Sequence, residues 1–233
     1  VVLARDRFVL RSYSPVRAIG GGEVLHALPL KKKRFSKTVL KELEILRNGE
    51  LGDIAEQFVH MGRFQGVENK TLPFLTNASK KKLDDILKSL MAQKRIMQYD
   101  KEKGMLIHAD FSDQAREELL TTLKQYHRDF PLKQGLLTEE LRSRTTGSRN
   151  QKLFVYLINQ LIQEGIIVQE KEIVRMKEHR VTLAQDQEKV KEEMDETYLK
   201  AGLQPPYFKE LKDKYPGTTG GDVLEVMVKE GTL

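Results

Sequence analysis

The sequence lacks cysteine and contains no apolar run long enough to span a membrane. Without cysteine there are no disulfides and no thiolate metal sites, which suits a reducing compartment, so we expect a cytoplasmic protein. No secretory signal pattern opens the chain, and no membrane partner is expected. Aromatic residues make up only 7% of the chain. Core packing therefore explains the aromatic residues better than base stacking does.

Catalytic patterns are also absent from the sequence. Adjacent carboxylates such as Asp84 and Asp85 would point to different helix faces, so they favour capping or surface roles over acid-base chemistry. The glycine runs at 20–22 and 217–221 lack the lysine of a phosphate-binding loop. The histidines lack the spacing of a metal pair, which favours structural or solvated roles for them. The five are His26, His60, His108, His127 and His179. We therefore expect no enzyme activity, no cofactor and no metal in this chain.

Charge is abundant but nearly balanced. Forty basic residues face 34 acidic ones, giving a formal net charge of +6, and charged residues make up 32% of the chain. Such a balance favours a polyanionic partner only through a local basic patch. The hydrophobic content of 39% is low for one large core, so several small domains are expected.

The first 27 residues predict a pair of strands. Phe8 and Leu10 alternate with charged or outward positions at the period of a half-buried strand, and Ser14 and Pro15 supply a turn. The glycines at 20–22 predict a bulge or a sheet corner before a returning strand at 23–27. Two strands alone are marginal in water, so we expect the rest of their sheet to lie upstream.

A boundary falls near Ser36, after a basic run at 31–34 that is better explained as a linker than as a nucleic-acid contact. The pattern then becomes predominantly helical and contains a weak internal repeat. One apolar helical stripe recurs about 71 and then about 66 residues further on. Its three versions are Leu83, Ile86, Leu87 and Leu90; Phe154, Leu157, Ile158 and Leu161; and Gly220, Val223, Leu224 and Met227.

Each stripe is preceded by two further helical segments and, in the first two repeats, is followed by strands. The first repeat predicts helices over 50–61, 70–75 and 79–93 and strands over 96–99 and 105–108. In the second, an apolar face beginning at Ala115 and a capping Thr138 predict two helices, and Ser148 is expected to cap a third from Arg149. Strands are expected at 166–168, 173–174 and 181–182. This order is typical of the winged helix.

The third repeat is expected to be incomplete. Val190, Met194 and Tyr198 line a first helix that should end at Gly202, and the prolines at 205 and 206 begin a second. Leu233 falls where the wing would start. The predicted fold class is therefore mainly α with small β hairpins, arranged as tandem winged helices.

Two basic clusters surround the N-termini of the stripe helices, which in helix-turn-helix proteins face the phosphate backbone. We call Lys80, Lys81 and Lys82 the lysine cluster. The other cluster comprises Arg142, Arg144, Arg149 and Lys152. A solvated helix face is the favoured explanation for the lysine cluster, whereas for the arginines the solvated and RNA-binding explanations are balanced.

The chain resembles the bacterial selenocysteine-specific translation elongation factors, the SelB family. The residues at 7–11, 13–15 and 19–25 resemble the end of that family's third β-barrel domain. Those at 62–67 with Tyr99 and Asp100 resemble its first winged helix, and 201–206 resembles the approach to its third. The resemblance implies a barrel remnant at 1–30 and winged helices at 36–110, 111–183 and 184–233.

The resemblance also implies a function and partners. Such a factor binds GTP and selenocysteinyl-tRNA through its body, and a row of four winged helices reaches the selenocysteine insertion hairpin of the mRNA. This chain would be the coupling arm of a monomeric factor that works on the ribosome. GTP and magnesium would belong to a G domain upstream, and the principal hairpin contact to a fourth winged helix downstream.

Two other functions remain open from the residues alone. One is a tandem winged-helix regulator that binds DNA, although the expected recognition helices have few side chains suited to reading bases. The other is a protein-interaction array that uses acidic helix faces such as 188–196.

Overall fold

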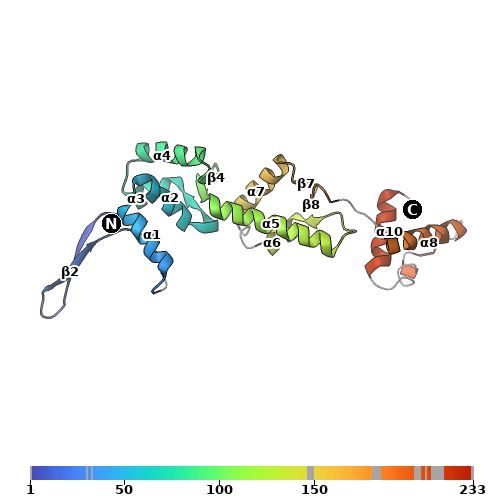
Figure 1. The fold of residues 1–233 in the computed structure, drawn as a ribbon, viewed down its shortest axis with the longest axis horizontal. Coiled ribbons are helices and arrows are strands. Elements are labelled where there is room, and N and C mark those ends of the chain that lie inside the picture. Colours follow the sequence, from blue (N-terminus) through green and yellow to red (C-terminus); the bar gives the residue numbers. More distant parts are fainter. Residues whose placement is uncertain are drawn as a thin grey trace. The chain divides into compact units, whose positions relative to one another are not determined.

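The computed structural model describes residues 2–29, 31–32, 34–145, 150–179, 185–201, 206–207, 209–210 and 218–231. It combines helices with small antiparallel sheets (Figure 1), which confirms the mixed α+β class. The chain forms two compact units, one of residues 1–118 and 146–157 and the other of residues 119–145 and 158–233. Among the described residues, no helix is both long and apolar enough to cross a membrane.

The first unit begins with a hairpin of β1 (Arg7–Arg11) and β2 (Ala18–Glu23), which confirms the predicted strand pair. The expected bulge or corner at Gly20 to Gly22 was wrong, because these glycines lie within β2 and pair with residues of β1. The irregularity falls instead between Leu10 and Arg11, opposite the unpaired Ile19. Half-burial was also wrong, since every residue of both strands is exposed. A two-stranded ribbon offers no second layer against which Phe8 could be buried.

The first repeat contains the predicted helices and wing strands in the predicted order, but they are preceded by α1 (Lys37–Asn48), a helix that the sequence pattern missed. Its other helical segments are α2 (Leu51–Met61), η1 (Arg63–Gln65), η2 (Asn69–Thr71), α3 (Leu72–Thr76) and α4 (Lys80–Ala92). Its strands are β3 (Val67–Glu68), β4 (Ile96–Asp100) and β5 (Met105–His108), in the order β3-β5-β4. The sequence pattern missed β3, because two residues are too few to show a period of two.

The apolar stripe of α4 explains how this repeat is held together. Leu83, Leu87 and Leu90 are buried in one cluster with Phe58 of α2 and Leu72 of α3. Residues three and four apart share a helix face, so burying these leucines turns the opposite face of α4 to solvent. The repeat thus presents a polar helix on a packed support.

The second repeat has the same order. It consists of α5 (Ala109–Asp129), β6 (Leu136–Leu137), α6 (Thr138–Arg144), α7 (Gln151–Gln163), β7 (Ile167–Glu170) and β8 (Ile173–Met176). The sheet order β6-β8-β7 repeats that of the first sheet. The predicted boundary at 111 falls inside α5, which starts at Ala109. The wing turn lies at 171–172, and the expected strand at 181–182 lies outside the described residues.

In all three repeats the stripe helix ends in the same way. Lys94, Gly165 and Gly231 follow the helices and have φ angles of 58°, 70° and 72°. The backbone N–H of each donates to the carbonyl three residues earlier. This left-handed end is the common way for a helix to stop, and glycine accommodates it without strain. The recurrence supports the repeat on backbone grounds that are independent of side-chain similarity.

The third repeat contributes α8 (Gln185–Ala201) and α10 (Thr218–Glu230). Met194 of α8 is fully buried with the stripe residues Val223, Leu224 and Met227 of α10, as their spacing predicts. Leu132, from the segment after α5, belongs to the same cluster. Gly202, Pro205 and Leu233 lie outside the described residues, so the expected ends of this repeat are not described.

Candidate nucleic-acid interface

The lysine cluster occupies the first turn of α4. The three side chains Lys80, Lys81 and Lys82 are exposed, whereas Leu83 beside them is buried and fixes the rotation of the helix. Ser79 precedes the helix but makes no side-chain capping bond, and no acidic residue lies in the first turn. The N-terminal N–H groups of α4 are therefore left without their usual side-chain acceptor.

The electrostatics of this turn are unusual for a helix. The N-terminal end carries the positive pole of the helix dipole, so three ammonium groups there weaken the helix slightly rather than support it. Within the described part of the chain, no ion pair involves these three lysines, although Asp84 and Asp85 follow on the same helix. Lysine charge, the dipole and uncapped N–H groups together favour binding of a phosphate oxygen at this point.

A polar hollow lies beside the lysine cluster. Lys82, Ser79, Asn77 and Arg5 contribute to its lining. Asn77 has a left-handed backbone, and its side-chain amide donates to the carbonyl of Ala4 at 3.0 Å. Arg5 pairs with Glu23 at 2.9 Å. The base of the β1-β2 hairpin therefore lies next to the start of α4.

The arginines of the second predicted cluster have acidic partners. Arg142 donates through Nε and Nη2 to Glu139, at 3.0 Å and 2.7 Å. Arg144 donates to Glu140 at 2.6 Å, and its guanidinium lies 5.8 Å from the ring centre of Tyr126. Burial raises the pKa of Tyr126, with Glu140 adding to the rise. These pairs partly neutralise the two arginines, which reduces their attraction for a phosphate.

The other two residues of that cluster, Arg149 and Lys152, come later in the sequence, around the start of α7. Arg149 lies outside the described residues, as does the expected cap Ser148. The helix begins at Gln151 rather than at Arg149, because Asn150 accepts from the backbone N–H of Lys152 at 3.2 Å and so caps it. The side chain of Lys152 is 60% exposed, and its ammonium lies 3.3 Å from Glu102.

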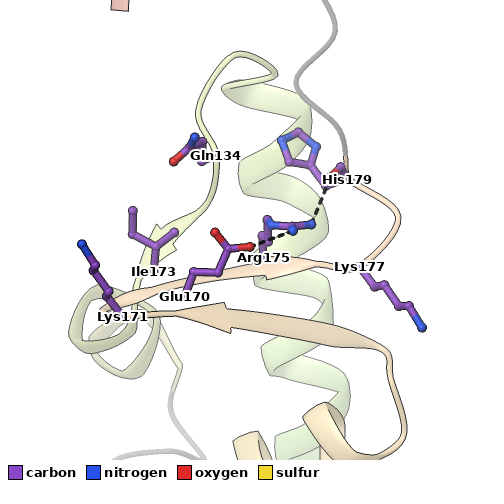
Figure 2. Close-up of a pocket in the computed structure, with 7 residues that line it drawn as sticks. All are labelled: Gln134, Glu170, Lys171, Ile173, Arg175, Lys177 and His179. Carbon is purple, nitrogen blue, oxygen red and sulfur yellow. Dashed lines mark hydrogen bonds and ion pairs between the residues drawn. The ribbon is translucent and has the colours of Figure 1, made fainter. Parts of the chain in front are cut away.

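The wing of the second repeat holds basic residues that sequence reasoning missed. Figure 2 shows Arg175 of β8 between Glu170, at 3.0 Å, and the backbone carbonyl of His179, at 3.4 Å. Lys171 and Lys177 line the same hollow. These basic residues form no cluster in the sequence, because glutamates alternate with them and the local net charge is small.

Helices in this order, followed by a β hairpin and closed by a short third strand, define a winged-helix protein. Residues 120–176 match the family model described as "Elongation factor SelB, winged helix". The chain is 32% identical over 233 residues to a selenocysteine-specific elongation factor of Desulfomicrobium baculatum. These matches confirm the resemblance of the chain to the SelB family, and residues 120–176 fit that family's winged-helix model.

A solved structure agrees with this fold. The crystal structure of the bacterial selenocysteine-specific elongation factor EF-Sec matches 98% of the chain with a TM-score of 0.51 and 17% sequence identity. The chain spans 36% of the length of the Desulfomicrobium relative and 34% of the EF-Sec chain. Both relatives are thus much longer than the sequence described here.

Proposed function

We propose that this chain is the RNA-binding and coupling arm of a selenocysteine-specific elongation factor. The arm links a body that binds GTP and selenocysteinyl-tRNA to the selenocysteine insertion hairpin of an mRNA on the ribosome. GTP and magnesium belong to the body and not to the arm. The similarity to a selenocysteine-specific elongation factor over 98% of the chain is the observation that supports this role most directly.

The repeated architecture suits such an arm. We divide the chain into the end of a barrel domain at 1–30 and winged helices at 36–110, 111–183 and 184–233. Two repeats with the same sheet order, and a third with the same buried stripe, support this division. A row of similar small domains extends a protein over distance with little core in each. The arm itself carries no catalytic role in this proposal.

The lysine cluster is the leading candidate for contact with an RNA backbone. Its charge lacks an ion-pair partner among the described residues, whereas Arg142, Arg144 and Lys152 each have a glutamate within 3.3 Å. An RNA phosphate must displace those glutamates before it can use the second cluster. We therefore rank the lysine cluster above the second cluster, reversing the order that sequence alone favoured.

Charge reversal tests the ranking. We expect the variant Lys80→Glu/Lys81→Glu/Lys82→Glu to bind a labelled insertion-hairpin RNA at least about tenfold more weakly at 100 mM salt, because phosphate contacts dominate such affinity. Arg142→Glu/Arg144→Glu should lose less. The matched control reverses three exposed lysines elsewhere, Lys37, Lys94 and Lys124, and changes net charge equally. Equal losses in the cluster and the control would show only a general charge effect and would refute the site.

The exposed side chains of α4 favour RNA binding over the alternative of sequence-specific DNA binding. The exposed residues of α4 are lysines, Asp85, Ser89 and Ala92, with no arginine, asparagine or glutamine before Gln93. Arginine, asparagine and glutamine make most of the bidentate contacts that read bases in a major groove, and among the residues present only lysine shares this ability, toward guanine. We therefore expect backbone recognition of RNA and no preference among duplex DNA sequences.

A further inference from the structure

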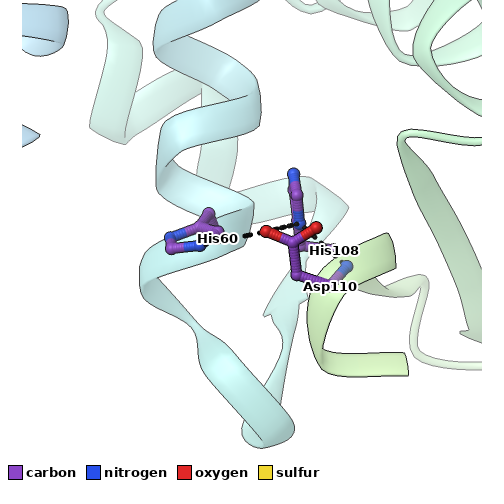
Figure 3. Close-up of side chains that lie close together, drawn as sticks. All are labelled: His60, His108 and Asp110. Carbon is purple, nitrogen blue, oxygen red and sulfur yellow. Dashed lines mark hydrogen bonds and ion pairs between the residues drawn. The ribbon is translucent and has the colours of Figure 1, made fainter. Parts of the chain in front are cut away.

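Three side chains with metal-ligand chemistry meet at one corner of the first unit. His60 comes from the last turn of α2, His108 ends β5, and Asp110 lies in the first turn of α5. Figure 3 shows the Asp110 carboxylate pointing between the two imidazoles. The ligand atoms of all three lie within 4.8 Å of one another. The fold thus collects donors that the sequence separates.

The two distances from Asp110 suit a small tetrahedral ion. The Oδ2 atom of Asp110 is 3.6 Å from Nε2 of His60 and 3.5 Å from Nδ1 of His108. Zinc bonds to histidine and carboxylate are about 2.0–2.1 Å long, so two ligands of one tetrahedral ion lie roughly 3.4 Å apart. Both distances from Asp110 are close to this ligand-to-ligand distance. The two rings contact edge to face, with their centroids 4.9 Å apart.

A supporting carboxylate already orients one of the imidazoles. Nε2 of His108 lies 3.2 Å from Oε1 of Glu56, and Glu56 is paired with Arg95. Glu56 is only 8% exposed, so this contact is well protected from water. A carboxylate that receives the second ring N–H is the usual companion of a metal-bound histidine, because it fixes the tautomer and strengthens the ligand. It leaves Nδ1 of His108 facing Asp110.

One existing bond must yield before an ion can bind. The backbone N–H of Asp110 donates to Nδ1 of His108 at 3.2 Å. That N–H belongs to the first turn of α5, where water can satisfy it instead. The Asp110 side chain is 68% exposed and adjusts freely. His60 and Asp110 also line an open hollow that admits water as a further ligand.

We propose that His60, His108 and Asp110 form a site for a divalent transition-metal ion of the zinc type. The three residues supply three ligands, and water completes a tetrahedral shell. Bound metal ties the end of α2 and the end of β5 to the start of α5. This role is independent of RNA binding, because it concerns only the internal geometry of the first unit.

Titration of the untagged chain with Zn²⁺ alone tests the site. We expect one equivalent to bind with a dissociation constant below roughly 100 µM and to raise the melting temperature, since a ligand of the native state stabilises it. Asp110→Asn should weaken binding at least about tenfold. Asp113→Asn removes the same charge from an exposed position on the same helix and should bind as the parent does. Equal affinities in these two variants, or no binding below that limit, would overturn the proposal.

A spectroscopic readout guards against variants that fold poorly. Co²⁺ in the same chain should give the intense visible absorption of a tetrahedral site with nitrogen and oxygen ligands, and Zn²⁺ should abolish it. His60→Gln and His108→Gln should lose the absorption while keeping the helical circular dichroism of the parent. Absorption typical of six-coordinate Co²⁺, or retained in both histidine variants, would exclude this site.

Discussion

The side-chain amide of Asn150 donates a hydrogen bond to the phenol oxygen of Tyr99 at 2.9 Å. Tyr99 is buried near the end of β4, and its hydroxyl donates a hydrogen bond to the backbone carbonyl of Gln65 at 2.7 Å. Because the Asn150 carbonyl also caps α7, one side chain joins the start of α7 to the wing of the preceding repeat. Burial raises the pKa of Tyr99, and the Asn150 bond opposes that rise.

Removing this junction should cost measurable stability. Asn150→Ala removes a helix cap and a hydrogen bond to a buried phenol, each of which contributes about 1 kcal/mol. We expect the free energy of unfolding to fall by about 2 kcal/mol in a denaturant titration. Asn150→Asp keeps the cap and should recover about half of the loss. The same loss in both variants would mean that the bond to Tyr99 carries the whole effect.

The left-handed residue after α4 predicts a stabilising change. Lys94 has a φ of 58°, where a Cβ is strained, whereas Gly165 fills the equivalent place in the second repeat. Lys94→Gly should raise the free energy of unfolding by about 0.5–1 kcal/mol, measured by denaturant titration. Lys88→Gly, within α4, is the control and should lower it by about 1 kcal/mol. A loss at both positions would contradict the shared helix end.

The stacked pair His127 and His179 predicts a pH effect. Burial, His179 and Arg175 lower the pKa of His127 to about 4. The ring centroids are 3.7 Å apart, and Nε2 of His127 accepts from the backbone N–H of Met176. A folded pKa below the unfolded value of about 6.5 means that the unfolded chain binds more protons between these values. Stability should therefore fall as pH is lowered from 7 toward 4.

Denaturant titrations at pH 7 and pH 5 check this effect. His127→Gln keeps an acceptor for Met176 but cannot titrate, so its stability should change less between the two pH values than that of the parent. Burial also lowers the pKa of His26 in the other unit, so His26 is kept unchanged in both proteins. An identical pH dependence in the parent and in His127→Gln would show that other groups cause it.

Sequence patterns predicted the helices and wings from α2 onward because their physical signals are local, but they missed α1. The stripe from Leu83 to Leu90 has helical spacing, and the charged residues and glycine at 100–104 mark the turn between two apolar strands. The start of α7 was misjudged because its cap, Asn150, has a neighbour of similar capping propensity in Ser148. The conformation of the glycines of β2 was predicted wrongly, because pairing with β1 holds them in a regular extended strand.

The functional groups were harder to predict, since their behaviour depends on contacts between distant segments. Sequence shows that Arg142 and Arg144 are basic, but only the structure shows them paired with Glu139 and Glu140. Likewise, the spacing of His60 and His108 carries no metal signal, because a helix end and a strand end bring them together. Resemblance to the SelB family supplied a function that charge and periodicity leave open.

The salt dependence of RNA binding tests the central proposal most directly. Each phosphate neutralised by a lysine contributes about 0.7 to the slope of log K against log salt for single strands and about 0.9 for a duplex. Replacing Lys80, Lys81 and Lys82 with serine should therefore reduce the slope for the insertion-hairpin RNA by about 2–3. A separate control variant, with Lys37, Lys94 and Lys124 replaced by serine, should keep the slope of the parent. An unchanged slope in the variant of the lysine cluster would contradict a phosphate contact at the start of α4.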